Sequence, residues 1–453
     1  MRPPFSVCGT AFHAPRRGQV EILPDALIEI GADGAIAAVL RPDHPDYRDR
    51  KAAAARSGAL RLLPEGRYLL PGFVDLHIHA PQFPQLGKAL DASLADWLQK
   101  YTFPLEARYA DRAFAAPVYQ KLVGTLLANG TTTAVYFATR HLEGSLMLAE
   151  TCLARGQRAV IGRVAMDDEG QCPSYYRDAS PEEGIDLTRR FIHRLRALPG
   201  NETALVRPAV TPRFIPSCTD RLLAGLGELL SAEACHMQTH CSESDWAHGY
   251  VLERFGKSDT GMLAEFGLLT RRSILAHANL MEPGDFDLVQ ARGSGIAHCP
   301  LSNFYFANAV FPVRRALDQD LHVGLGTDIS GGHSPSLLDN CRHAMTAARA
   351  LHDGVDGRIQ APKRGAAPAR ITPDEAFWLA TAGGAEALDL PVGRFQAGLQ
   401  FDALVVDVAA PHSNIVLADD DGPADILQKI LCNAGRADIA SVWVEGRLVH
   451  GLA

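Results

Sequence analysis

The chain has 453 residues, of which 47% are hydrophobic and 21% charged, and its formal net charge is −8. This length accommodates a large α/β unit with a smaller second domain, and the composition is typical of a globular protein. The negative charge argues against a protein that grips a nucleic-acid backbone, and the sequence holds no apolar run of membrane-spanning length, so we expect no nucleic-acid or membrane partner.

The cysteines and the start of the chain bear on the cellular compartment. Nine cysteines are scattered without a CxxC pair, which favours reduced thiols over disulfides or a cysteine zinc site. The residues that follow Met1 contain too little continuous apolar sequence for a secretory leader. We therefore expect a cytoplasmic protein.

Short β segments occupy the first 70 residues. Alternating apolar residues predict strands at 20–23, 26–30 and 35–40, with a turn at Asp33 and Gly34. The run 49–63 is rich in alanine and arginine with weak helical periodicity, and we interpret it as a connector of undetermined structure.

From about residue 72 the pattern changes to short apolar strands separated by longer amphipathic segments. This alternation is typical of a parallel sheet with helices outside it, and eight strands are the number in a closed (β/α)₈ barrel of the TIM type. The predicted strands are 72–79, 132–137, 158–165, 205–210, 235–240, 273–277, 295–298 and 322–327. Predicted helices between them include 113–129, 142–155, 186–198, 220–230 and 245–255.

The last quarter of the chain returns to β signals. Residues 353–370 predict a mobile loop, and a helix is expected to begin at Pro373 with Thr372 as its N-cap. Strand patterns follow at 401–407 and 441–449. Because neither end can stand alone, we expect both to form one small β-sandwich, which gives domains 1–70 (first part of the sandwich), 71–390 (barrel) and 391–453 (second part).

Two histidines at the end of the first barrel strand are the strongest local signal. His77 and His79 are separated by one residue, so on an extended strand their side chains lie on the same face. A single strand-end histidine is more often structural than a metal ligand. The pair therefore needs further ligands from elsewhere in the chain.

Other strands of the predicted barrel supply such ligands. Active sites of these barrels lie at the carboxyl ends of the strands, so the residues that end each strand are expected to meet. Imidazole and carboxylate ligands suit Zn²⁺, Fe²⁺ or Mn²⁺ in a catalytic site, and the absence of lysine from the fourth strand favours one ion rather than two. The strand-end candidates are His77, His79, Thr211, Arg213, Phe214, His240, Glu243, His277, His298 and Asp328.

Each remaining candidate has a plain structural alternative. Asp328 could be a helix N-cap, and Glu243 could stabilise the first turn of the following helix. His277 could bind the metal or hydrogen-bond the attacking water. His298 is interpreted as structural or as a support for the ligands, and Cys241 as a lining residue because no His/Asn pair serves it.

Several motifs resemble those of the amidohydrolase superfamily, and more narrowly those of guanine deaminases. The superfamily resemblance rests on Pro71-Gly72-Phe73-Val74-Asp75-x-His77-x-His79, on His240 and His277, and on Gly326-Thr327-Asp328. The narrower one rests on His79-Ala80-Pro81-Gln82, Trp97 to Glu106, Thr211-Pro212-Arg213-Phe214, Gln238-Thr239-His240-x-x-Glu243 and His298-Cys299-Pro300-x-Ser302-Asn303.

The resemblance implies a zinc-dependent hydrolysis of guanine to xanthine and ammonia. Zinc, one ion per chain, would be held by His77, His79, His240 and Asp328, with His277 as a further ligand or water partner. Glu243, Asp328 and His277 would be catalytic, and the substrate-binding residues would be Gln82, Arg213, Phe214, His240 and Asp328. We also expect a homodimer.

Two alternatives remain open at this point. A related amidohydrolase could deaminate another aminated heterocycle, such as a pterin, a triazine or an adenosine derivative, with the same metal ligands. A non-catalytic scaffold of the same fold is the other. The complete set of predicted metal ligands in this sequence argues against such a scaffold.

Overall fold

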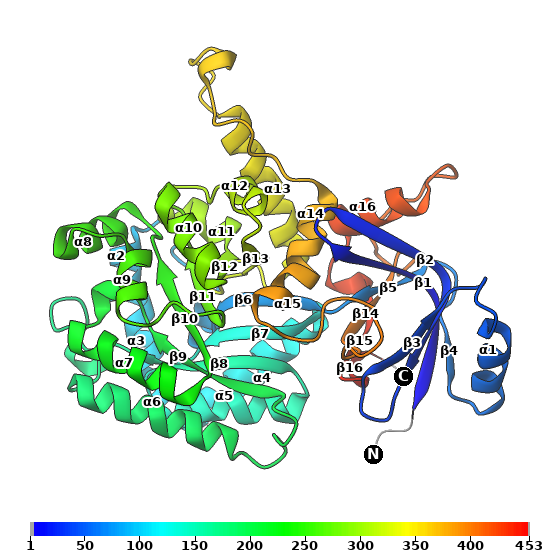
Figure 1. The fold of residues 1–453 in the computed structure, drawn as a ribbon, viewed down its shortest axis with the longest axis horizontal. Coiled ribbons are helices and arrows are strands. Elements are labelled where there is room, and N and C mark those ends of the chain that lie inside the picture. The colour runs from blue at the N-terminus through cyan, green and yellow to red at the C-terminus, as the bar shows by residue number, and fades with distance from the viewer. Residues whose placement is uncertain (1–3, 452–453) are drawn as a thin grey trace.

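The computed structural model describes residues 4–451, and it contains two eight-stranded sheets (Figure 1). The first is a parallel barrel sheet in which the strands follow one another in chain order. This is the predicted (β/α)₈ fold. Its strands are β6 (Phe73–His79), β7 (Thr131–Phe137), β8 (Arg158–Ala165), β9 (Val206–Pro212), β10 (His236–Cys241), β11 (Ser273–His277), β12 (Gly295–His298) and β13 (His322–Leu325).

The barrel strands agree closely with the sequence prediction. Strands β8, β11 and β12 have the predicted bounds, and the other five differ by one or two residues at an end. Nearly every strand residue is buried, as expected for strands covered by helices on one side and by one another on the other. Apolar residues of six of the strands pack in one cluster with Ala385 and Ala387, which lie in a short helix near the end of the barrel.

Helices cover the outside of the barrel (Figure 1). Two have the predicted bounds, and the predicted 186–198 helix begins earlier, at Pro181, because the Ser180 side chain accepts a hydrogen bond from the backbone N–H of Glu183. The helices from α2 to α12 are α2 (Leu94–Trp97), α3 (Phe103–Ala107), α4 (Arg112–Ala128), α5 (Leu142–Arg155), α6 (Pro181–Arg196), α7 (Asp220–Glu233), α8 (Asp245–Phe255), α9 (Asp259–Glu265), α10 (Pro283–Arg292), α11 (Pro300–Ser302) and α12 (Val313–Asp318).

Four more helices follow the last barrel strand: α13 (Leu337–Asp353), α14 (Pro373–Trp378), α15 (Gly384–Ala387) and α16 (Pro423–Asn433). Helix α13 and the segment after it project from the body of the molecule (Figure 1). This segment contains a short 3₁₀ turn, Ala361–Lys363, within the predicted loop. The predicted cap of α14 is confirmed, because the Thr372 side chain accepts from the N–H of Glu375.

The second sheet combines the two ends of the chain, as predicted. All eight strands are hydrogen-bonded into one continuous mixed sheet, in the order β16-β15-β14-β5-β1-β2-β3 with β4 beside β1. Strands β5 and β14 join the two chain ends through five antiparallel residue pairs. The strands are β1 (Phe5–Arg16), β2 (Gln19–Ile30), β3 (Ile36–Leu40), β4 (Leu60–Leu62), β5 (Arg67–Pro71), β14 (Ala403–Asp407), β15 (Ile439–Val444) and β16 (Arg447–Gly451).

This sheet departs from the sequence prediction in several places. Strand β1 was not predicted, because Gly9 and Pro15 interrupt its apolar pattern, and the pairing with β2 contains two register shifts. The predicted strand 441–449 is a hairpin that turns at Glu445 and Gly446, both at positive φ. The connector 49–63 contains most of helix α1 (Tyr47–Arg56) and all of β4. The division into 1–70, 71–390 and 391–453 as folding units stays a prediction.

Side-chain and backbone contacts close the barrel between its first and last strands. The Asp75 carboxylate accepts hydrogen bonds from the Thr327 N–H at 3.0 Å and from its hydroxyl at 2.6 Å. The Asp328 N–H donates to the His77 carbonyl at 2.8 Å, and the His79 N–H donates to the Ile329 carbonyl at 2.8 Å. The segment after β13 is therefore fixed against β6.

A buried ion pair joins the barrel to the mixed sheet. Arg158, the first residue of β8, donates two hydrogen bonds to the Asp402 carboxylate at 3.2 and 3.3 Å, and also contacts Glu445 at 3.2 Å. The Asp402 carbonyl in turn accepts from the Gly72 N–H, directly before β6. These contacts bridge residues that are more than 240 positions apart in the sequence.

All nine cysteines carry free thiols, and eight of them are buried. Within residues 4–451, the structure holds no helix that is both long and apolar enough to cross a membrane.

We expect Asp402→Asn to lower the free energy of unfolding by about 3 kcal/mol, because it leaves Arg158 buried with only Glu445 as a counter-charge. The measurement is urea-induced unfolding followed by circular dichroism. Asp407→Asn is the matched control, since its partner Arg67 is 41% exposed and such pairs contribute less than about 1 kcal/mol. Equal losses in both variants would contradict a special role for the buried junction.

Candidate active site

The predicted histidine pair lies at the end of β6, where the strand passes into a 3₁₀ turn. His77 and His79 are 1% and 4% exposed, and their ring centroids are 4.9 Å apart. Both rings contact the face or edge of Phe137, the last residue of β7, with centroids 4.9 and 4.8 Å away. The two imidazoles are thus held in place by the neighbouring strand.

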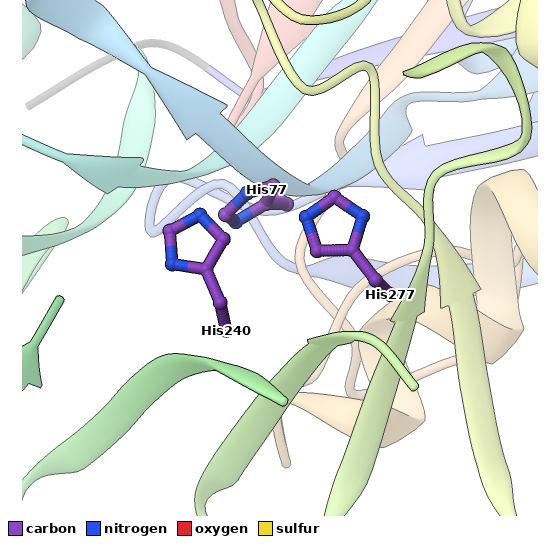
Figure 2. Close-up of side chains that lie close together, drawn as sticks. All are labelled: His77, His240 and His277. Carbon is purple, nitrogen blue, oxygen red and sulfur yellow. The ribbon is translucent and has the colours of Figure 1, made fainter. Parts of the chain in front are cut away.

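The strand-end histidines of β10 and β11 meet this pair, as the barrel geometry predicts. Figure 2 shows His77, His240 and His277 pointing toward one another from three strands. The ring centroid of His77 is 4.9 Å from that of His240 and 5.3 Å from that of His277. The rings of His240 and His277 are stacked at 5.5 Å.

Hydrogen bonds fix which nitrogen of two rings faces the centre. Nδ1 of His240 donates to the Arg213 carbonyl at 2.6 Å. Nδ1 of His277 lies 3.0 Å from Oδ1 of Asn303, whose amide nitrogen donates to Asn279. Both rings therefore carry their proton on Nδ1, which leaves the Nε2 lone pairs to bind a cation.

Asp328, at the end of the last barrel strand, completes the cluster. It follows β13 with φ at +49°, a left-handed conformation that aspartate tolerates better than most residues. One carboxylate oxygen lies 3.3 Å from Nε2 of His77 and 3.7 Å from that of His79, and the other lies 3.9 Å from Nε2 of His277. The aspartate thus faces three of the four imidazoles.

The donor atoms form two groups that fit a divalent cation, namely His77 with His240 and His277, and His77 with His79 and Asp328. Within each group the donor atoms lie within 4.8 Å of one another. The Nε2 atoms of His77 and His277 are buried without a hydrogen-bond partner, and those of His79 and His240 are 3.0 Å apart. A cation bound to either group would engage the Nε2 lone pair of His77.

Electrostatics favour the ligand forms of these side chains. Burial, with the neighbouring cationic groups, lowers the pKa of His77, His79 and His240 well below the ordinary histidine value. They are therefore neutral at physiological pH, which is the form that binds metal.

Glu243 lies beside the cluster, in the loop after β10. Its Oε1 is 3.6 Å from Nε2 of His277. Burial, with a smaller contribution from Asp328, raises its pKa to about 8, so the carboxyl group holds a proton at neutral pH. The alternative role at the start of α8 belongs to Ser244, whose hydroxyl accepts from the Ala247 N–H.

A pocket opens onto the cluster. It is lined by the five predicted substrate-binding residues Gln82, Arg213, Phe214, His240 and Asp328, the last two of which are also predicted metal ligands. Apolar side chains from α2 and its continuation form another wall. The pocket is lined by His79, Gln82, Leu94, Trp97, Leu98, Arg213, Phe214, His240, Glu243, Phe306, Asp328 and Gly331.

Sequence reasoning assigned no role to several residues that build this site. Glu106 forms a buried ion pair with Arg213, with Nη1 and Oε2 2.7 Å apart, and accepts a hydrogen bond from Gln82 at 2.8 Å. Asp75 and Asn303 orient the cluster as described above. Glu106 and Asn303 stand inside recognised motifs, but only the fold reveals what they contact.

Two other strand-end residues stay outside the cluster. Both ring nitrogens of His298 are buried without a hydrogen-bond partner, burial lowers its pKa to about 3, and its ring packs 5.4 Å from that of Phe311. Neither group of donor atoms includes it. Burial raises the pKa of the Cys241 thiol, which is therefore not activated as a nucleophile.

Comparisons with known proteins agree with this fold. Residues 68–449 match the model of the amidohydrolase family. A probable guanine deaminase of Schizosaccharomyces pombe is 38% identical over 98% of this chain and 83% of its own length, and a guanine deaminase of Dictyostelium discoideum is 36% identical over 97% of each. The crystal structure of guanine deaminase from C. acetobutylicum with guanine bound in its active site superimposes with a TM-score of 0.86 at 27% identity, covering 98% of this chain and all of that one. The resemblance seen in the sequence is thereby confirmed, and the chain belongs to the amidohydrolase family, within its guanine deaminase branch.

Proposed function

We propose that this chain hydrolyses guanine to xanthine and ammonia. The observation that carries the proposal is the shared wall of the pocket. His79, His240 and Asp328, which belong to the cation-binding cluster, line the same cavity as Glu243 and the polar residues Gln82 and Arg213. A planar base held by the polar edge of this pocket lies against both the cluster and a protonated carboxyl group.

A divalent cation, which we propose to be one zinc per chain, would be held by His77, His79, His240 and Asp328, with His277 as a further ligand or water partner. When bound, it supplies the Lewis acidity that makes water a nucleophile near neutral pH. The donor set of imidazoles and one carboxylate, without thiolate, supports a catalytic rather than a structural ion.

The protein side chains then act on the base and on its protons. Gln82 and Arg213 hold the purine edge by hydrogen bonds, and Phe214 packs against its face. Glu243 donates its proton to the ring nitrogen beside C2 while C2 is attacked, and Asp328 accepts the proton that the attacking water loses. Asp328 passes this proton to the amino group, which leaves as ammonia, and the oxygen added at C2 returns a proton to Glu243 as it becomes the second ring carbonyl of xanthine.

Buried polar partners make such a pocket selective. A base that leaves Arg213 or Gln82 unpaired loses about 1–3 kcal/mol for each unsatisfied group. This favours guanine over triazine or adenosine substrates, which present different edges. A scaffold without activity would have no need of a protonated Glu243 beside four convergent imidazoles.

The proposal extends to the cytoplasm as the location and to a homodimer as the assembly. Free guanine arises from nucleotide breakdown inside cells, which supports the first. Size-exclusion chromatography with light scattering tests the second.

We expect Glu243→Gln to keep its metal but to lower kcat for guanine by about 100- to 10,000-fold, because the amide cannot donate the ring proton. The conversion is followed by ultraviolet absorbance, and metal content by mass spectrometry. Glu253→Gln, an exposed residue on α8, is the control and should leave kcat unchanged. Normal turnover by the Glu243 variant would refute its role as proton donor.

We expect His77→Ala to purify without bound metal and without guanine turnover, because His77 belongs to both groups of donor atoms. The wild-type protein should lose activity on dialysis against a chelator and regain it when zinc is returned. Full activity of the metal-free protein would rule out the proposed centre.

A panel with guanine, a pterin, a triazine and adenosine identifies the preferred base in the same assay.

A further inference from the structure

A fully buried carboxylate lies behind the polar wall of the pocket, which is formed by Gln82 and Arg213. Glu106, on α3, is 0% exposed, and it does not itself line the cavity. Its Oε2 accepts a hydrogen bond from Arg213 at 2.7 Å, and its Oε1 accepts from Arg213 at 3.3 Å and from Gln82 at 2.8 Å. Both polar residues of the predicted purine-binding wall are therefore tied to the same carboxylate.

This carboxylate also fixes which atoms the wall presents. The Gln82 amide nitrogen donates to Glu106 while its oxygen accepts from the Ser330 N–H at 3.3 Å, so the amide cannot flip without losing both bonds. The Arg213 guanidinium is 2% exposed and also lies over the ring of Phe103 at 5.2 Å. Both side chains are thus held rigid from behind.

The charge balance of the wall has a chemical consequence. A buried guanidinium without a counter-charge would attract an anionic ligand strongly, because charges are poorly screened in a protein interior. Paired with Glu106, Arg213 still offers N–H donors but contributes almost no net charge. The wall therefore binds the rim of an uncharged base without favouring an anion.

We propose that Glu106 is a positioning residue that compensates the charge of Arg213 and so makes the pocket select an uncharged purine over an anionic one. The inference rests on the proposed function and extends it. Guanine is uncharged near neutral pH, whereas xanthine, with a second ring carbonyl, loses a ring proton more readily. Charge compensation at Arg213 thus favours uptake of the substrate and release of the more acidic product.

The test compares two bases of nearly the same outline at one fixed pH. 8-Azaguanine has a nitrogen in place of the C8–H of guanine and loses its proton at a lower pH, so at weakly alkaline pH it is an anion while guanine is uncharged. The readout is the ratio of kcat/KM for 8-azaguanine to that for guanine. Both kcat/KM values are measured on the same preparation. The fraction of folded protein and the protonation states of Glu243 and Asp328, which face the same pocket, therefore cancel in the ratio.

For Glu106→Gln we expect this ratio to rise about tenfold over the wild type, because Arg213 is left as an uncompensated cation. Glu106→Asp keeps the charge but shortens the side chain, so both kcat/KM values should fall while their ratio stays near that of the wild type. An unchanged ratio in Glu106→Gln, or an equal rise in Glu106→Asp, would overturn the inference.

A second variant covers the case in which Glu106→Gln does not fold. In Arg213→Gln the carboxylate of Glu106 loses its cation, so the ratio should fall about tenfold instead of rising, and a rise would overturn the inference. Failure of the wild-type protein to deaminate guanine would instead refute the proposed function, and this inference with it. Normal guanine turnover with an unaltered ratio in the variants would refute the inference alone.

Discussion

Closure of the barrel between its first and last strands is the constraint on which the site depends. Strands β6 and β13 lie at the two ends of the barrel sheet, and the gap between them is bridged by Asp75, which holds Thr327, and by the backbone bond from Asp328 to His77. Nε2 of His77 and Oδ1 of Asp328, which are far apart in the sequence, thereby lie 3.3 Å from one another. Without this contact His77 and Asp328 could not share a cation.

The same closure explains the electrostatic character of the centre. Four buried imidazoles lie together, three of them with a pKa well below the ordinary value, and two of their nitrogens lack any hydrogen-bond partner. Such an arrangement destabilises the folded state unless a ligand is bound, since buried polar atoms without hydrogen-bond partners are unfavourable. Strained or unsatisfied groups of this kind gather at functional sites. A bound cation would give the unpartnered Nε2 atom of His77 a partner.

Much of the barrel and its strand-end residues could be predicted from the sequence, for a physical reason. Parallel strands buried on both faces leave short apolar runs that are easy to find, and the carboxyl ends of such strands converge at one end of the barrel. His240, His277 and Asp328 end or directly follow such runs, so their meeting with His77 follows from the fold alone. The ligand roles of these residues stay predictions until an ion is observed.

The features of the fold and the site that could not be predicted depend on tertiary contacts that no local sequence pattern encodes. Strand β1 carries Gly9 and Pro15 and is held in the sheet by its neighbours, so its own sequence does not predict it. Glu106 lies 107 positions from Arg213, and nothing in their spacing indicates an ion pair. The turn at Glu445 divides a run that looks like one strand, because alternation alone does not distinguish a strand from a tight hairpin.

The most direct test of the central claim is the position of the metal in a crystal of the zinc-loaded protein, measured by anomalous scattering at the zinc edge. We expect a single peak about 2.0–2.2 Å from the ligand atoms of His77, His79, His240 and Asp328. A peak bound elsewhere, or a pair of ions bridged at this centre, would contradict it.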